Sequence, residues 1–161
     1  LWTLEGDKLA EFPGRRIKHL SVRERLDYLD NLAAQLHGGG MLSDSYLKAL
    51  QDFKRDPAPE VLTDLAGKLE DFTRDFIHDG NRTNFAAFVR DVLGPGMKRI
   101  GRLPAENETA FTITTRARLI GLLGQVGRHT SILRQARREA ERFLDEAGAG
   151  NGDLAAVWTG A

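Results

Sequence analysis

Few side chains in this sequence have the types and spacing that catalysis or metal binding requires. No two of the four histidines have the HExxH or HxxxH spacing that places two imidazoles on one helical face for zinc. Asp75 and His78 lie three residues apart and could share a metal ion, but such residues near a helix end are more often surface residues that compensate the helix dipole. P-loop, GxGxxG and GxSxG motifs are absent, and a chain without cysteine has no thiolate chemistry. We therefore predict no catalytic residue and no metal ligand.

Two arginines are better candidates for a binding role. Arg116 and Arg118 interrupt the apolar stripe of a predicted helix. A guanidinium in such a position either pairs with a carboxylate of its own chain, here Glu106 or Glu108, or faces the carboxylate of a ligand. The internal ion pair is the favoured reading, and Arg116 and Arg118 are the candidate ligand-binding residues if it does not hold.

Charge and hydropathy limit the partners of the chain. The 161 residues carry 23 basic and 23 acidic side chains, so the formal net charge is zero. Residues 96–142 hold ten Lys or Arg and four Asp or Glu, a band that we interpret as a solvated helical face with ion pairs rather than a nucleic-acid site. The apolar runs are far shorter than the ~20 residues that a membrane span needs. We expect no nucleic-acid partner and no membrane partner; the compartment stays open, with the cytoplasm favoured.

Helices must position these side chains, because almost every segment after residue 20 repeats apolar residues at steps of three and four. The first segment follows Ser21, which forms a capping-box pattern with Glu24, and it ends at three glycines, 38–40. Pro95, between two glycines, predicts a kink or an interruption in the fourth helix. We expect six helices within residues 21–147, starting near residues 21, 43, 58, 83, 108 and 129.

The fifth of these segments is ambiguous at short range. Residues 111–115, Phe-Thr-Ile-Thr-Thr, have strong strand propensity by themselves. The wider window overrules this propensity, since apolar residues recur at helical spacing from Phe111 to Val126. Asn107 and Glu108 supply an expected cap and a negative charge at the start. We therefore predict a helix here.

The predicted helices pair into hairpins that recur about every 40 residues, a period typical of HEAT and armadillo arrays. The predicted fold class is all-α, an α-α superhelix of HEAT/armadillo-like helical hairpins. Residues 1–20 show no clear period and form a lead-in segment, and Asp153 begins a further helix that is cut short within residues 153–161. With a start on Leu1 rather than Met, we expect residues 1–161 to be a single helical-repeat domain, a partial array from a larger chain.

Several short motifs follow one another in an informative order. They are Leu20–Arg25, Tyr28–Ala33, Tyr46–Leu50, Phe85–Leu93, Glu108, Arg116, Leu123–Gly124, Gly127 and Gln135–Arg138. In this order they resemble the helical C-terminal domain of the zinc aminopeptidase N family, and its puromycin-sensitive aminopeptidase branch most of all. The resemblance covers residues from about 20 to 158. Thr115 and Arg102 depart from it, since they stand where the family usually has Leu and Trp.

The resemblance implies a non-catalytic part of an enzyme that removes N-terminal residues from peptides with metal-activated water. In that family the zinc motif lies in a preceding catalytic domain, so zinc is expected in the parent's catalytic domain and no cofactor in this chain. The helical domain forms a curved shell that walls off the active site and shapes peptide access. A free-standing helical-repeat scaffold for protein interactions is the alternative function.

The partners implied by the resemblance are the catalytic domain of the same parent chain and a peptide substrate. Arg116 is the first candidate to contact the peptide, as a cation for its C-terminal half, and Arg118 is the second. A partial array leaves an apolar face uncovered at its end, so self-association of the chain is also expected.

Overall fold

The structure, a computed structural model, describes residues 6–11 and 14–148. Every element in this part of the chain is a helix and no strand occurs in it, which confirms the all-α prediction. None of these helices is long and apolar enough to cross a membrane. The elements are α1 (Gly6–Glu11), the 3-10 helix η1 (Gly14–His19), α2 (Val22–His37), α3 (Ser43–Gln51), α4 (Pro59–Phe76), α5 (Arg82–Ile100), α6 (Ala110–Gln125) and α7 (Thr130–Gly148).

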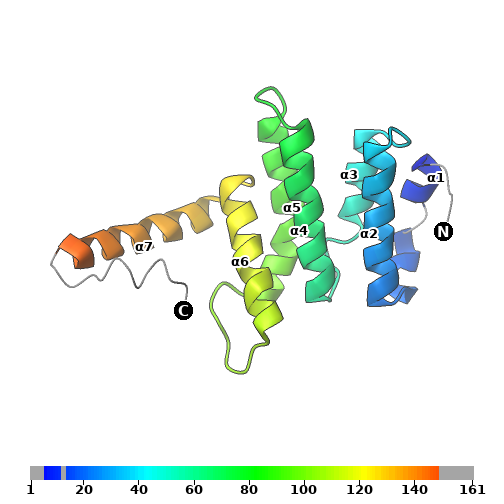
Figure 1. Ribbon diagram of the computed structural model, residues 1–161. Coiled ribbons are helices and arrows are strands. Elements are labelled where there is room, and N and C mark those ends of the chain that lie inside the picture. Colours follow the sequence, from blue (N-terminus) through cyan, green and yellow to red (C-terminus); the bar gives the residue numbers. More distant parts are fainter. Residues whose placement is uncertain (1–5, 12–13, 149–161) are drawn as a thin grey trace.

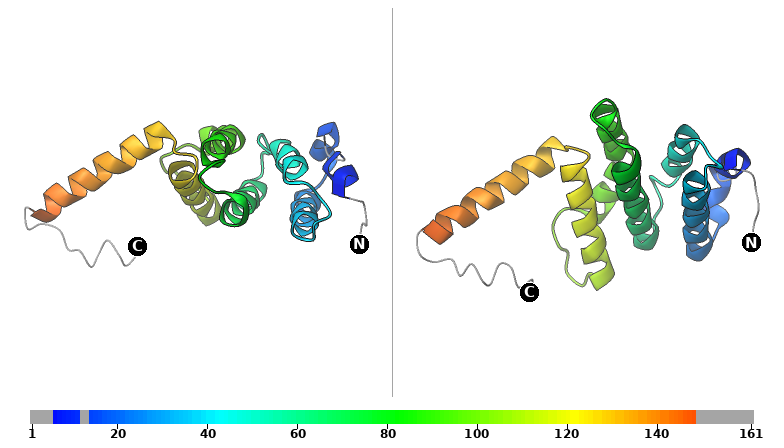
Figure 2. Two further views of the ribbon diagram at one scale, coloured as in Figure 1. Left: turned by 90° about the horizontal axis from the view of Figure 1, so that it is seen from above. Right: turned by 45° about the horizontal axis from the view of Figure 1, so that its top comes forward.

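The helices from α2 to α6 stand side by side in two layers (Figures 1 and 2). One layer consists of α2, α4 and α6, with α4 in contact with both of the others. The second layer contains α3 and α5, and α5 packs on α4 and α6. α1 contacts α2 and α3 at the N-terminal end. The arrangement is that of an α-helical superhelix of hairpins; its assignment to the HEAT or armadillo type stays a prediction.

Local sequence signals place the helices well. Helices α2 to α7 begin at residues 22, 43, 59, 82, 110 and 130, each within two residues of the predicted start. The capping box at the start of α2 is formed, because the Ser21 N–H donates to Glu24 Oε2 at 2.7 Å and the Glu24 N–H donates to Ser21 Oγ at 3.3 Å. Residues 111–115 lie inside α6, as the wider apolar window predicts and their strand propensity does not.

Of the predicted kink or interruption at Pro95, the interruption is wrong, since α5 runs unbroken from Arg82 to Ile100, and the kink stays a prediction. Leu93 and Met97 are buried on either side of the proline, so packing holds the helix where propensity alone would end it. At Gly96 the helix comes close to α4, because a Cβ on this residue would lie 2.9 Å from Cδ1 of Leu62.

The predicted cap of the fifth helix is also wrong. Thr109 is the N-cap of α6, and its hydroxyl accepts the Thr112 N–H at 3.1 Å. Asn107 has a φ of 63°, a left-handed conformation that Asn tolerates in turns. Glu108, which was expected to supply a negative charge at the helix start, forms an ion pair with Arg116.

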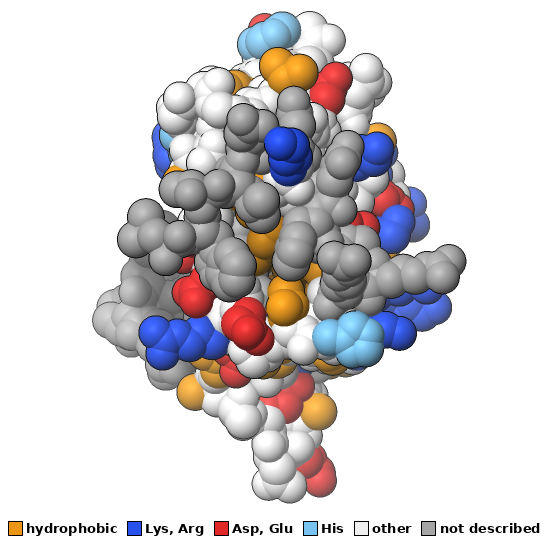
Figure 3. Space-filling model, turned by 90° about the vertical axis from the view of Figure 1, so that its right-hand side faces the viewer, with side chains coloured by type: hydrophobic (Ala, Val, Ile, Leu, Met, Phe, Trp, Pro, Cys, Tyr) orange, Lys and Arg blue, Asp and Glu red, His pale blue; other side chains and the backbone are white. Residues whose placement is uncertain are grey.

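The lead-in segment holds more structure than its sequence indicates. α1 and η1 have six residues each, too few to show a period, yet they bury Leu9 and Ile17. The Tyr28 hydroxyl of α2 donates to the Leu9 carbonyl oxygen. Figure 3 looks onto this end of the molecule, where hydrophobic side chains show near the centre of the face and charged side chains lie around them. The helix expected in residues 153–161 lies outside the described residues.

One core runs through all the hairpins and fixes their positions. Its fully buried members include Leu29 of α2, Leu65 of α4 and Leu119 of α6. An aromatic stack crosses from α3 through α4 to α5, with ring centroids 5.8 Å apart for Tyr46 and Phe72 and 5.4 Å apart for Phe72 and Phe85. Because the core is continuous, polar side chains on neighbouring helices are held in register with one another.

Candidate functional site

The two candidate arginines, Arg116 and Arg118, lie on different sides of α6. Two positions along an α-helix turn a side chain by about 200° around the axis. Arg116 is buried, with 4% of its surface exposed, whereas the side chain of Arg118 is 37% exposed. The structure therefore separates two residues that the sequence groups together.

Arg116 holds the loop between α5 and α6 against α6. Its guanidinium forms an ion pair with Glu108, and its Nε donates to the Gly101 carbonyl oxygen at 3.0 Å. The hydrogen bond from Arg116 lowers the pKa of Glu108, so the carboxylate stays charged. Of the alternatives that the sequence leaves open, the structure contains the internal ion pair with Glu108.

Arg118 bridges α6 to α4 at the surface. Its Nη2 donates to Glu70 Oε2 at 2.7 Å and its Nε donates to Glu70 Oε1 at 3.4 Å. The guanidinium lies over Gly67, where a Cβ would be only 3.0 Å from Nη2. The bond to Glu70 raises the pKa of Arg118, so the side chain stays cationic.

A hollow opens beside Arg118 between α4 and α6, with a volume of about 320 Å³; we call it the α4–α6 hollow. Arg74 stands at the same hollow and donates to Asp71 at 2.8 Å and Asp75 at 3.2 Å. Two guanidinium groups thus border a small hollow with a partly apolar lining, an arrangement that suits a carboxylate with a short apolar group. The lining residues are Glu70, Thr73, Arg74, Arg118, Gly121, Leu122, Gln125 and Val126.

The lining of this hollow does not form a catalytic set. The one hydroxyl in it, that of Thr73, donates to the Leu69 carbonyl oxygen at 2.6 Å, and no histidine borders the hollow. Nucleophilic catalysis by a hydroxyl needs an adjacent base, and the one carboxylate in the lining, that of Glu70, is bound to Arg118. The arrangement can therefore bind a ligand, but these residues offer no nucleophile and base pair.

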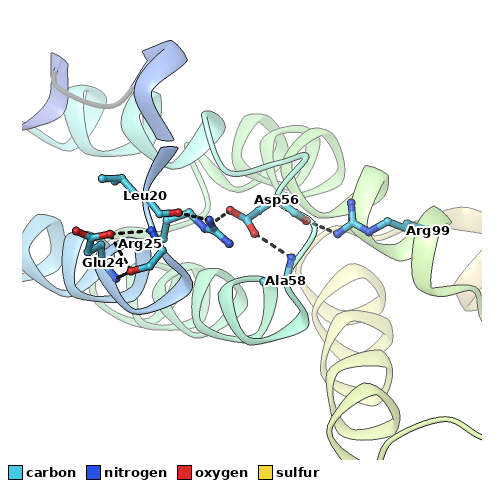
Figure 4. Close-up of polar contacts among 7 residues, drawn as sticks. Leu20, Glu24, Arg25, Asp56, Ala58 and Arg99 are labelled. Atoms are coloured by element: carbon cyan, nitrogen blue, oxygen red, sulfur yellow. Dashed lines mark hydrogen bonds and ion pairs between the residues drawn. The ribbon is translucent and has the colours of Figure 1, made fainter. Parts of the chain in front are cut away.

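A second polar cluster, buried rather than exposed, joins the first two hairpins (Figure 4). Arg25 Nε lies 2.8 Å from Asp56 Oδ2, and Arg25 Nη1 donates to the Leu20 carbonyl oxygen at 2.6 Å. Asp56 Oδ1 accepts the Ala58 N–H at 3.0 Å, and the Asp56 carbonyl oxygen accepts a hydrogen bond from Arg99 of α5. Asp56 therefore ties α2, the α3–α4 loop and α5 together.

Sequence reasoning misses this cluster, because it treats residues 56–59 only as a break between helices. The signal that could reveal part of it is local: an Asp in a proline-rich turn commonly accepts the backbone N–H two residues on, as Asp56 does from Ala58. Arg25 has no such signal, since its partner lies on another hairpin.

Among the described residues, no three His, Cys, Asp or Glu side chains lie together as they would to hold a metal ion. The pair noted in the sequence makes local contacts instead. Asp75 pairs with Arg74 at 3.2 Å, and His78 Nδ1 accepts the Gly80 N–H at 3.2 Å.

Comparison with protein-family models matches residues 4–158 to the ERAP1-like C-terminal domain. No solved structure matches the chain. The match agrees with the resemblance seen in the ordered motifs, while the puromycin-sensitive branch stays a prediction. Because nearly the whole chain is matched, it belongs to the ERAP1-like C-terminal domain family, a C-terminal domain of the aminopeptidases.

Proposed function

We propose that this chain is a wall of a zinc aminopeptidase that shields the active site and shapes how peptides reach it, without catalytic groups of its own. Zinc belongs to the catalytic domain of the parent protein on this proposal, and that domain is the intramolecular partner. The family match supports the aminopeptidase context. The observation that carries the role of a wall is the cross-linked helix layer of α2, α4 and α6.

Polar contacts join neighbouring helices of this layer on both sides of α4. Lys68 of α4 pairs with Asp30 of α2, and Glu70 of α4 pairs with Arg118 of α6. Beneath the second pair, the hydroxyls of Thr63 and Thr115 lie 2.8 Å apart. The Thr63–Thr115 contact and the shared apolar core hold these helices in place, and the surface ion pairs add a small contribution. A barrier of fixed shape requires such packing.

Peptide contact is assigned to the α4–α6 hollow rather than to Arg116. The guanidinium of Arg116 is already bound to Glu108 and to the Gly101 carbonyl oxygen, so its donors face the chain itself. Arg118 and Arg74 border the hollow and are more accessible. On this proposal they bind a carboxylate in the C-terminal half of a peptide.

The first test is hydrolysis of aminoacyl fluorogenic substrates by this chain, with and without added zinc. We expect no hydrolysis in either condition, because the proposed role is that of a wall. Zinc-dependent cleavage by the purified chain would overturn the proposal.

The second test is peptide binding, measured by the fluorescence anisotropy of a labelled peptide with a free or an amidated C-terminus. Arg118→Ala is expected to weaken binding of the free-carboxylate peptide about fivefold or more, because a charge-assisted hydrogen bond is lost. Arg137→Ala, on the distant α7, is the matched control and should leave binding unchanged. Equal effects of the two substitutions would reject the hollow as the peptide site.

A further inference from the structure

Another hollow, with a volume of about 420 Å³, lies where α5, α6 and the start of α7 meet; we call it the α5–α7 hollow. Its volume is that of a small-molecule pocket. Part of its lining is apolar, since Met97 of α5, Leu123 of α6 and Ile132 of α7 are all buried. The lining residues are Gly94, Met97, Lys98, Gly101, Arg102, Leu123, His129 and Ile132.

The polar side chains of this lining are all basic. Lys98 lies in the last turn of α5, Arg102 follows the end of that helix, and His129 immediately precedes α7. No carboxylate belongs to the described lining. Neither Lys98 nor Arg102 forms an ion pair in the part of the chain that the structure describes. Three basic groups therefore border one hollow without a negative charge to compensate them.

Hydrogen bonds through a serine hold two of these side chains near each other. Arg102 Nη2 donates to Ser131 Oγ at 2.7 Å, and Ser131 Oγ lies 3.0 Å from His129 Nδ1. The bonds join the α5–α6 loop to the first turn of α7. A guanidinium has further N–H donors that this bond does not use, so Arg102 can bind Ser131 and a ligand together.

Carboxylates elsewhere in this chain do not need three basic partners. Glu70 is matched by one arginine, Arg118, and Glu108 is matched by one arginine, Arg116. The three basic side chains of the α5–α7 hollow exceed that requirement. A phosphate monoester carries a charge of about −1.5 to −2 at pH 7 and offers three acceptor oxygens, so it matches this lining in both charge and hydrogen bonding.

We propose that the α5–α7 hollow binds a small organic phosphate monoester, with the phosphate on the three basic side chains and the organic group against the apolar part of the lining. Hydrogen bonds from charged lysine and arginine side chains to phosphate oxygens are among the strong ones in proteins. The site is independent of the proposed wall function, because it uses none of the residues of the α4–α6 hollow.

Isothermal titration calorimetry of the 161-residue chain with phenyl phosphate, at fixed ionic strength, tests the site. We expect a dissociation constant of about 1 mM or lower. Lys98→Ala and Arg102→Ala should each raise it about fivefold or more, because each removes a charge-assisted hydrogen bond. Lys48→Ala is the matched control, since it removes an exposed lysine of α3 outside the hollow and should leave the constant unchanged. No binding at about 10 mM ligand, or equal weakening by Lys48→Ala, would overturn the proposal.

Two further ligands test the chemistry of the site. Benzoate keeps the ring of phenyl phosphate but carries a carboxylate, so it should bind about fivefold more weakly or worse. Glycerol phosphate keeps the phosphate and replaces the ring by a polar group, so it should also bind more weakly, because it gains nothing from the apolar part of the lining. Benzoate binding as tight as that of phenyl phosphate would overturn the assignment to phosphates, and equally tight binding of glycerol phosphate would overturn the apolar contact. The substituted side chains are exposed, and circular dichroism of each variant confirms that the helical content is retained.

Discussion

Two ion pairs connect successive hairpins of this chain, and they differ in their burial. At the first junction, the side chains of Arg25 and Asp56 are 9% and 2% exposed. At the second, those of Arg118 and Glu70 are 37% and 40% exposed. Removing one member of a buried pair leaves an uncompensated charge away from water, whereas the remaining member of an exposed pair is solvated.

The difference in burial means that the first junction depends on its ion pair, whereas the second junction does not. Asp56 also binds the Ala58 N–H and, through its carbonyl oxygen, Arg99, so the first junction depends on one residue. At the second junction the buried contact is between Thr63 and Thr115, and Arg118 lies above it beside the α4–α6 hollow. On the proposed function, Arg118 would exchange Glu70 for a peptide carboxylate while the Thr63–Thr115 contact keeps the junction closed.

The strongest way to test this contrast is Asp56→Ala. It should lower the free energy of unfolding by about 3 to 5 kcal/mol, because Arg25 would remain buried without its partner. Urea denaturation followed by circular dichroism measures the change. Asp79→Ala is the matched control, since it removes a fully exposed partner of Arg82 and should leave the midpoint nearly unchanged. A similar loss of unfolding free energy in both variants would show that the first junction does not depend on the buried Asp56 side chain.

Thr115→Val tests the buried contact of the second junction. The Thr115 hydroxyl donates to the Phe111 carbonyl oxygen at 2.8 Å and meets the Thr63 hydroxyl, and valine keeps its shape but removes both bonds. We expect a loss of about 1 kcal/mol in the free energy of unfolding. Thr115→Ser keeps the hydroxyl but removes the methyl group, so comparing it with Thr115→Val separates the effect of the hydrogen bonds from that of packing. A valine variant more stable than the serine variant would show that packing dominates.

Arg118→Ala should change stability by about 0.5 kcal/mol or less, because surface ion pairs contribute little and are screened by salt. The same urea titration with and without added salt measures it. The small difference is expected to vanish at high salt, and a large loss that persists in salt would show that the second junction depends on this pair after all.

Asp64 of α4 lies between the two junctions and offers a test by pH. Burial raises its pKa above the ordinary 3.8, although Lys68 opposes the shift. The folded state therefore binds a proton more readily than the unfolded state, so this group's contribution to stability falls as pH rises from 3.8 through the raised pKa. Asp64→Asn should be as stable as the parent, or slightly more so, at pH 7, and that difference should disappear below pH 3.8. If Asp64→Asn were less stable than the parent at pH 7 but equally stable below pH 3.8, the ionised carboxylate would stabilise the fold, which contradicts this prediction.

Local patterns predicted much of this molecule. The capping box of Ser21 and Glu24 and the starts of six helices depend on residues within one turn or on a repeating stripe, so the sequence contains their physical cause. The pairing of Arg116 with Glu108 was within reach for a similar reason, because the two residues lie eight positions apart.

Features that depend on tertiary contacts were beyond the sequence. Arg25 and Asp56 are 31 positions apart and lie on different hairpins, so no local pattern pairs them. Pro95 misleads for the same reason, because packing around Leu93 and Met97 sustains α5 where the local pattern would end it. The α4–α6 hollow arises only when two helices meet.

The close approach at Gly96 bears on the direction of the whole array. With no side chain there, α5 comes close to Leu62 of α4, and a single added carbon would lie 2.9 Å from Cδ1 of Leu62, so that buried side chain would have to shift. In a stack where each hairpin seats the next, a tilt introduced at one crossing is carried forward by every later helix. A substitution at position 96 that the Leu62 side chain could not accommodate would tilt α5, and α6 and α7 would then carry that tilt forward.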